Sequence, residues 1–226
     1  MRTWYRNFKI KKVIHMEKII YDLYLKHLNF NGDSLYWKKA TANSTIDYRK
    51  LVCNEIRKSR FGINTQKKIL KWGGIHRFKQ FSLVKKVISD LDKNNKININ
   101  TAKAISSYSK LFGFYKPKEY FILDARVCYV YNKLIISSNI ANKMPVKFDI
   151  NRSRNKTLIT KYRTTMGLWN SNTKSVEDFY PEYCKFIRST HKYFLQKDSK
   201  IFSKRKFANN DPEIIEMFLF FIADYI

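Results

Sequence analysis

A segment in the middle of the chain has the pattern of a positioned carboxylate. Residues 121–123 (Phe-Ile-Leu) are apolar, and residues 124–127 (Asp-Ala-Arg-Val) follow as the predicted start of a helix. An Asp at a helix N-cap is bound by backbone N–H groups and favoured by the helix dipole, so it stays ionised and rigid. Such a carboxylate can stabilise a developing positive charge and orient an attacking water or amine. The alternative is that Asp124 is only a structural cap.

Residues 121–127 resemble a segment of the helix-hairpin-helix DNA glycosylase superfamily, in particular of bacterial proteins similar to 8-oxoguanine DNA glycosylases. In that superfamily the Asp of the segment caps a helix and faces the flipped nucleotide. A weaker helical resemblance covers residues 60–136. The resemblance implies double-stranded DNA as partner and cleavage of the N-glycosidic bond of a damaged or modified base. Asp124 would stabilise the oxocarbenium-like sugar.

A lysine in the preceding helix is the second residue that the resemblance singles out. Bifunctional members of the superfamily use a Lys near the start of that helix as a nucleophile, which forms a Schiff base with the sugar. The match is Lys110, with Lys103 as a second possibility. Lys110 precedes Asp124 by 14 residues, about one helical turn less than the superfamily spacing. This spacing favours water as the nucleophile.

The expected DNA-binding hairpin departs from the superfamily pattern. Members usually have a Leu-Pro-Gly-x-Gly turn whose backbone N–H groups bind a phosphate, whereas residues 96–102 here (Lys-Ile-Asn-Ile-Asn-Thr-Ala) contain no glycine. Asn can adopt the left-handed conformation that such a turn requires, although less readily than Gly. The sequence therefore predicts either a remodelled hairpin or DNA binding mainly elsewhere.

Net charge points to a polyanionic partner. The 226 residues contain 45 Lys and Arg against 18 Asp and Glu, which gives +27, and 16% of the residues are aromatic. An excess of this size together with many aromatic residues favours a folded nucleic-acid binder over a basic tail. Part of the Lys, Asn and Ile excess fits an AT-rich genome.

Basic residues cluster in two segments, 137–172 and 197–206. The first lacks sustained periodicity and has Asp149 as its one acid, which predicts a DNA-facing loop or irregular insertion. Arg126 could reach a phosphate or pair with an acid. The predicted DNA-binding residues are Arg126, Lys143, Lys147, Arg152, Arg154, Lys156, Lys161, Arg163, Lys204, Arg205 and Lys206, with Trp169 as a candidate for stacking on a base.

The cysteines and histidines indicate neither a metal nor a disulfide framework. Cys53, Cys128 and Cys184 are odd in number and form no CxxC pair, which favours a reducing compartment. The four histidines show no ligand spacing, so we expect no metal and no cofactor. The longest apolar run, 217–223, is too short to span a membrane, and no signal-peptide segment is recognisable. We expect a cytoplasmic, nucleoid-associated monomer without a membrane partner.

Helical periodicity recurs along most of the chain, and no strand pattern is convincing. Predicted helices begin at Met16, Ser44, Thr65, Ser82, Thr101, Asp124, Ser175 and Asp211. We therefore expect a mostly α, multi-helix bundle of the helix-hairpin-helix glycosylase type. It would form a single domain over residues 16–226, with residues 1–15 as a basic arm. The last predicted helix carries acids without Lys or Arg, so we expect it to pack away from the polyanion-binding face.

Two further functions compete with base excision. The first is a catalytically silent DNA-binding module of the same fold, in mobile-element or phage-defence biology. The second is an RNA-binding or ribosome-associated basic protein, which fits the composition but not the Asp124 segment. An open cleft at Asp124 would favour the enzyme, and an Asp124 buried solely as a cap would favour the silent module.

Overall fold

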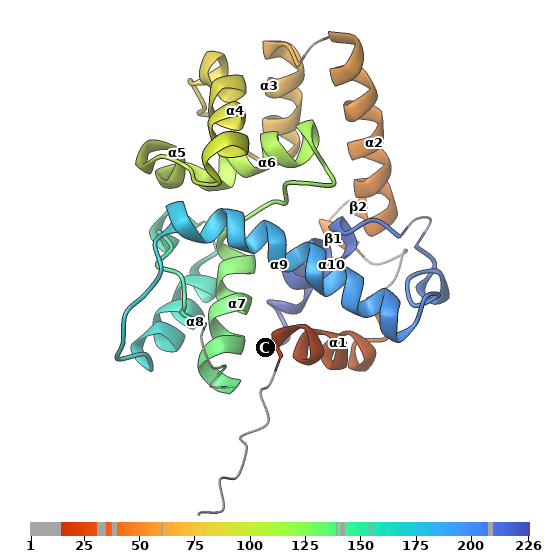
Figure 1. The fold of residues 1–226 in the computed structure, drawn as a ribbon, viewed down its shortest axis with the longest axis vertical. Coiled ribbons are helices and arrows are strands. Elements are labelled where there is room, and N and C mark those ends of the chain that lie inside the picture. Colours follow the sequence, from red (N-terminus) through yellow and green to blue (C-terminus); the bar gives the residue numbers. More distant parts are fainter. Residues whose placement is uncertain are drawn as a thin grey trace, which may run out of the picture.

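The computed structural model describes residues 15–30, 35–37, 40–59, 61–138, 140, 143–153, 155–207 and 210–226. Over these residues the chain is mostly helical, as the sequence predicts (Figure 1). The α-helices are α1 (Met16–Lys26), α2 (Ala42–Ser59), α3 (Ile63–Trp72), α4 (Val84–Asn94), α5 (Ile99–Lys103), α6 (Ile105–Tyr115), α7 (Ala125–Ser138), α8 (Lys156–Gly167), α9 (Val176–Lys197) and α10 (Glu213–Ile222). Short 3-10 turns are η1 (Phe81–Leu83), η2 (Ile150–Arg152) and η3 (Ser203–Arg205). The strands β1 (Leu35–Trp37) and β2 (Ala40–Thr41) form an antiparallel pair with Leu35 opposite Thr41.

The helices form two halves that meet at the start of α6 and the start of α7. Helices α2, α3, α4, α5 and α6 pack together in the upper part of Figure 1, and α1, α7, α8 and α10 lie below them. The long α9 crosses the front of the molecule and contacts α1, α5 and α10. Residues 116–124 carry the chain from one half to the other. Asp124 therefore lies at the boundary between the halves.

An aromatic cluster holds α1 and α10 against α9. The buried Tyr24 ring of α1 makes edge-on contacts, with centroids 5.1 to 6.0 Å away, to the rings of Phe30, Phe194, Phe202 and Phe218. Pairs of this geometry contribute about 0.5–1.5 kcal/mol each beyond the area they bury. This cluster fixes the half of the protein on which α7 and the segment before it rest.

Helix α10 is a core helix. All but one of its residues are buried, and Glu213 and Glu216 lie inside the protein with their carboxylates paired to Arg49 of α2. The helix is apolar on nearly all sides, which is the pattern of an element surrounded by others. Phe220 of α10 borders the cleft described below, and the expectation that this helix packs away from the polyanion-binding face stays a prediction.

The basic segment 137–172 is more regular than the sequence indicates. Helix α7 continues to Ser138, and α8 occupies residues 156–167 behind an N-cap in which Asn155 Oδ1 accepts from the Leu158 N–H at 3.0 Å. The prediction of an irregular insertion is wrong for α8, whose buried face consists of only Leu158, Tyr162 and Thr165 among basic and polar residues. Residues 143–149 are extended, and Asn132 of α7 holds both backbone groups of Val146 at 2.8 Å.

Several expectations concern what the chain lacks. Cys53, Cys128 and Cys184 are free thiols in the structure. Among the described residues, no cluster of His, Cys, Asp and Glu has the arrangement of a metal site. No helix in the described part of the chain has the length and apolar character of a membrane span. The basic arm falls mainly on residues 1–14, outside the described residues, as do Arg154 and the side chain of Arg152.

Candidate active site

Asp124 and Lys110 line the same cleft, which has a volume of about 620 Å³. The cleft lies between the two halves. Its walls come from the end of α3, the junction of α5 and α6, the start of α7, the segment 148–158 and α10. Half-buried Phe78 and Phe148 and buried Phe220 supply apolar surface, and Arg77, Lys103 and Arg126 supply positive charge. Aromatic surface with cations beside it is suited to a flat, anionic ligand such as a nucleotide.

Asp124 both caps α7 and faces the cleft. Its Oδ1 accepts from the backbone N–H groups of Arg126 at 3.0 Å and Val127 at 3.2 Å. Both bonds end on Oδ1, so capping alone does not occupy Oδ2. The side chain is half-buried and is part of the cleft wall. Asp124 is therefore a helix cap that is not buried solely as a cap.

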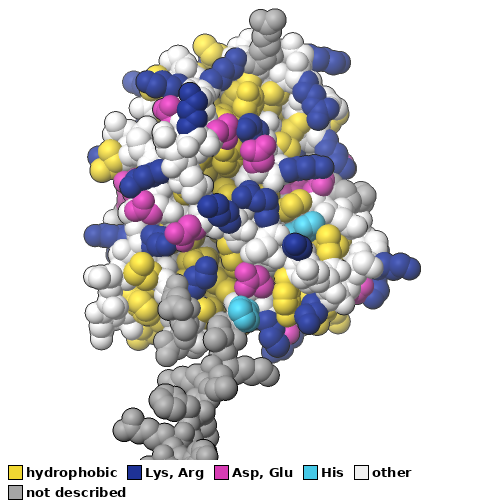
Figure 2. Space-filling view, viewed as in Figure 1, with side chains coloured by type: hydrophobic (Ala, Val, Ile, Leu, Met, Phe, Trp, Pro, Cys, Tyr) yellow, Lys and Arg dark blue, Asp and Glu magenta, His cyan; other side chains and the backbone are white. Residues whose placement is uncertain are grey.

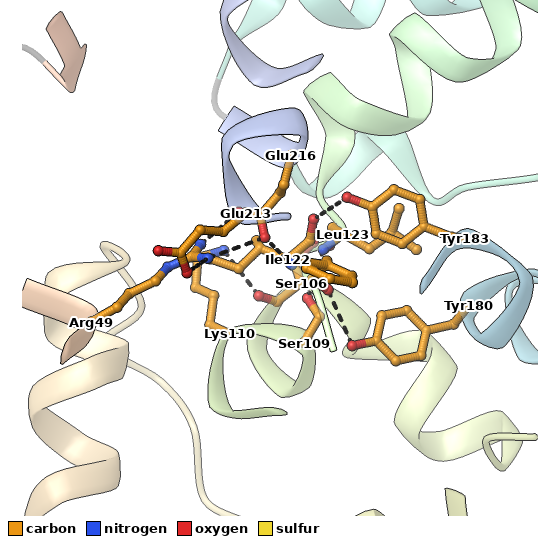
Figure 3. Close-up of polar contacts among 11 residues, drawn as sticks. Arg49, Ser106, Ser109, Lys110, Ile122, Leu123, Tyr180, Tyr183, Glu213 and Glu216 are labelled. Atoms are coloured by element: carbon orange, nitrogen blue, oxygen red, sulfur yellow. Dashed lines mark hydrogen bonds and ion pairs between the residues drawn. The ribbon is translucent and has the colours of Figure 1, made fainter. Parts of the chain in front are cut away.

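Side chains from three helices bind the backbone that leads into Asp124 (Figure 3). Tyr180 and Tyr183 of α9 donate to the carbonyls of Phe121 at 3.1 Å and Ile122 at 2.9 Å. Ser109 Oγ of α6 accepts from the Leu123 N–H at 3.0 Å and donates to the Leu123 carbonyl at 3.2 Å.

The amide of Ile122 donates to Glu216 Oε2 of α10 at 2.8 Å. Extended residues 121–123 are thus held on both backbone sides, which fixes where the next residue, Asp124, begins its helix.

Lys110 is buried in α6 with its amine directed back along the helix. Its Nζ donates to the Ser106 carbonyl, one turn earlier, at 2.9 Å. Burial lowers the pKa of Lys110, against the negative charges of Asp124 and Glu216, which raise it. A lowered pKa increases the fraction of neutral amine, the form that can act as a nucleophile.

Gly73 makes room for the Lys110 side chain. A Cβ atom built on Gly73 would lie 2.4 Å from Lys110 Cδ and 2.6 Å from Cε, well inside contact distance. The end of α3 therefore packs its bare backbone against the aliphatic part of this lysine. Gly73 is not in the left-handed region, since its φ is −75°. The requirement for glycine here comes from Lys110 and not from backbone strain.

The direction of the Lys110 side chain determines where its amine lies. Side chains in a helix point toward its N-terminus. The Lys110 amine consequently lies about one turn before its own Cα, next to Ser106. Lys103, the second possibility, lines the same cleft but is exposed at the end of α5.

The glycine-free hairpin forms a tight junction between α4 and α5. Asn95 adopts the left-handed conformation (φ 49°, ψ 34°) that ends α4, and Asn98 Oδ1 caps α5 by accepting from the Thr101 N–H at 2.8 Å. Two asparagines thus connect the helices, one by adopting the left-handed conformation and one by capping α5, and DNA binding by this segment stays a prediction.

The predicted DNA-binding residues lie in different surroundings. Arg126 lines the cleft, pairs with Asp224 at 2.7 Å and lies 4.8 Å from the centre of the Phe220 ring. Arg205 is turned inward, where it donates to the carbonyls of His27 at 2.6 Å and Phe30 at 3.2 Å. These contacts give Arg205 a structural role, and its assignment to the DNA face stays a prediction.

Those of the other predicted residues that the structure describes lie outside the cleft wall. Lys161 donates to the carbonyl of Ile226, Arg163 donates to Asn151, Lys204 pairs with Asp198, and Trp169 Nε1 donates to the Asn172 carbonyl. Exposed cations without a cleft contact are Lys143, Lys147, Lys156 and Lys206. Lys and Arg are spread over the face in Figure 2 with Asp and Glu among them, so this view shows no continuous basic stripe.

Sequence reasoning missed the residues that hold the site together. The sequence marks Gly73 only as the end of a helix, and no sequence pattern singles out Ser109 or the two tyrosines of α9. One signal was present in Glu213 and Glu216, two acids in an otherwise apolar helix without a cation. Buried carboxylates require a partner, and that partner is Arg49.

Comparison of the chain with protein-family models, with curated proteins and with solved structures gave no match.

Proposed function

We propose that this protein excises a damaged or modified base from duplex DNA by cleaving its N-glycosidic bond. The observation that carries the proposal is the convergence of a helix-capping carboxylate, Asp124, and a buried lysine amine, Lys110, in one cleft. The two residues are those that the resemblance to helix-hairpin-helix glycosylases singles out. The cleft lies between two halves, with aromatic and cationic side chains available to a flipped nucleotide.

In this proposal Asp124 acts through its charge. Loss of the base leaves positive charge on C1′ and O4′ of the sugar, and a fixed carboxylate stabilises that charge without having to reorganise. The cap geometry and the bonds to residues 121–123 keep the carboxylate in place.

Lys110 supplies the nucleophile in the version of the reaction that its burial favours. Its neutral amine attacks C1′ and the C1′–N bond breaks, so that the base leaves with the electron pair and takes up a proton. The C1′–O4′ bond then opens as one Nζ proton passes to O4′, and a protonated imine joins Nζ to C1′. The alternative is a water molecule oriented by Asp124, as the sequence spacing favours.

Double-stranded DNA is the proposed partner. The net charge of +27 and the cations at the cleft, Arg77, Lys103 and Arg126, suit contacts to phosphates on either side of a flipped nucleotide. The competing proposal, a silent DNA-binding module, draws on the capping role of Asp124, which requires no chemistry.

Base release tests the proposal. Duplexes that contain uracil, 8-oxoguanine or an abasic site are incubated with wild type, Asp124→Asn and Asp22→Asn, the last a control in an exposed ion pair of α1. The proposal predicts release of a free base, or processing of the abasic site, that is lost in Asp124→Asn and kept in Asp22→Asn. Tight duplex binding with no turnover of any substrate would favour the silent module.

A further inference from the structure

A buried ion pair lies directly behind the two candidate catalytic residues. Arg49 of α2 donates to Glu216 of α10 through Nη2 at 2.6 Å and Nη1 at 3.3 Å, and both side chains are about 1% exposed. Glu213, one turn earlier on α10, accepts from Arg49 Nη1 at 3.4 Å. Arg49 thus joins the upper half of the protein to the core helix of the lower half.

Burial makes this pair an unusual means of holding two helices together. Removing two charges from water costs several kcal/mol per ion, and well-packed apolar side chains of the same volume often stabilise a fold as much or more. A further contact sets this pair apart: Glu216 Oε2 also accepts from the Ile122 N–H at 2.8 Å, two residues before Asp124.

The same carboxylate acts on Lys110 through its charge. The charged groups that bear on the Lys110 amine are Asp124 at the start of α7, Glu216 on α10 and Arg49 on α2. Helix α3 faces the lysine with the backbone of Gly73, and α6 itself provides the Ser106 carbonyl. Of the acids, Asp124 caps a helix and faces the cleft, whereas Glu216 is held away from solvent by three hydrogen bonds.

We propose that Glu216, held by Arg49, is a positioning residue for base excision: it fixes the backbone that carries Asp124 and adds its charge to those that bear on the Lys110 amine. The inference rests on the proposed function for its reaction, and its geometry is independent of that function. Burial raises the pKa of Glu216, and the paired Arg49 guanidinium and the Ile122 N–H oppose that rise by favouring the ionised carboxylate. The pair therefore acts on both catalytic groups from a single buried point.

Titration of Lys110 tests the charge without any DNA. Nuclear magnetic resonance of the lysine side chain follows the pKa of Lys110 in wild type, Glu216→Gln and the double variant Arg49→Met with Glu216→Gln. The pKa is expected to fall in Glu216→Gln, because a negative charge that favours the ammonium is gone. It should fall less in the double variant, where the opposing charge of Arg49 is gone as well, and not in Glu182→Gln, an exposed control paired with Lys174.

The excision rate and its pH dependence test the positioning. In Glu216→Gln the maximal rate should fall by roughly tenfold to a hundredfold, because the backbone before Asp124 is held less well. The acid limb of the profile should move to lower pH with the pKa of Lys110. Glu216→Gln leaves Arg49 buried without its main partner, whereas the double variant removes both charges. The double variant therefore provides the rate measurement if Glu216→Gln fails to fold.

The outcomes separate this inference from the proposed function. An unchanged Lys110 pKa in both folded variants overturns the role of Glu216, whether or not the protein excises bases. If the Lys110 pKa falls in the variants but the wild type processes no duplex, the proposed function alone is overturned. A lowered pKa with an unchanged maximal rate overturns the positioning of Asp124.

Discussion

The contact between Gly73 and Lys110 predicts a large coupling between two small substitutions. The backbone of Gly73 (φ −75°, ψ 8°) suits alanine, and where nothing obstructs it, Gly→Ala stabilises a protein by about 0.4–1 kcal/mol. Here the new Cβ would lie 2.4 Å from Lys110 Cδ, whereas carbon atoms pack at about 3.5–4.0 Å. The lysine must therefore move by about 1 Å or more, and the Nζ bond to Ser106 is strained or lost.

Overpacking of this kind costs about 1–3 kcal/mol, which outweighs the gain from alanine. We expect Gly73→Ala to destabilise the wild type by about 1–2 kcal/mol and to stabilise a Lys110→Ala background by a few tenths of a kcal/mol. The coupling energy is then about 2 kcal/mol. Urea unfolding of wild type, both single variants and the double variant measures it.

A second glycine provides the control. Gly167 ends α8, and a Cβ built there meets no atom within 4 Å, so Gly167→Ala should have the same effect in both backgrounds. If the effects of Gly73→Ala and Lys110→Ala on the free energy of unfolding add to within about 0.5 kcal/mol, the packing of Lys110 does not require glycine at position 73. If the argument holds, Gly73→Ala should also displace the amine and weaken imine formation with DNA.

Three further predictions concern charge. Asp124→Asn keeps most of the cap, so it should cost no more than about 1 kcal/mol of stability in thermal unfolding while abolishing base release; failure to fold would favour a purely structural cap. If about six phosphates are bound, the logarithm of the DNA association constant falls against the logarithm of the salt concentration with a slope of roughly −5. Replacing Arg152, Arg154 and Lys156 by Gln should bring this slope to roughly −3. An unchanged slope would assign the DNA face to another surface. Burial raises the pKa of Glu213 to about 7. The folded state then binds the proton more tightly than the unfolded chain, so this group's contribution to stability falls as pH rises from about 4.5 to 7, and Glu213→Gln should flatten stability measured across that range.

Local signals along the chain located most of the helices. The Asp124 cap of α7 and the Ser175 cap of α9 follow from residue preference and hydrogen-bonding chemistry that act within four residues. Helix α8 was missed because its buried face has few apolar side chains, so the charge of its other residues dominates the pattern. The hairpin at Asn95 and Asn98 required knowing which asparagine adopts the left-handed conformation, which no local rule decides.

The candidate site depended on contacts that no local pattern encodes. Asp124 and Lys110 could be named from the sequence, but the burial of Lys110 and the bond of its amine to the Ser106 carbonyl could not. Arg49 meets Glu216 across 167 residues, and Gly73 meets Lys110 from another helix. These contacts are set by how the two halves pack.

Identification of the lysine that becomes attached to DNA distinguishes Lys110 from the other amines of the protein. Wild-type protein is incubated with a duplex that contains an abasic site, the imine is reduced with borohydride, and the modified peptide is sequenced by mass spectrometry. The account predicts a covalent adduct on Lys110 that disappears in Lys110→Gln and persists in Lys103→Gln. An adduct on Lys103 or on scattered surface lysines, or a yield unaffected by Lys110→Gln, would contradict the assignment of Lys110 as the amine that faces Asp124 in the cleft.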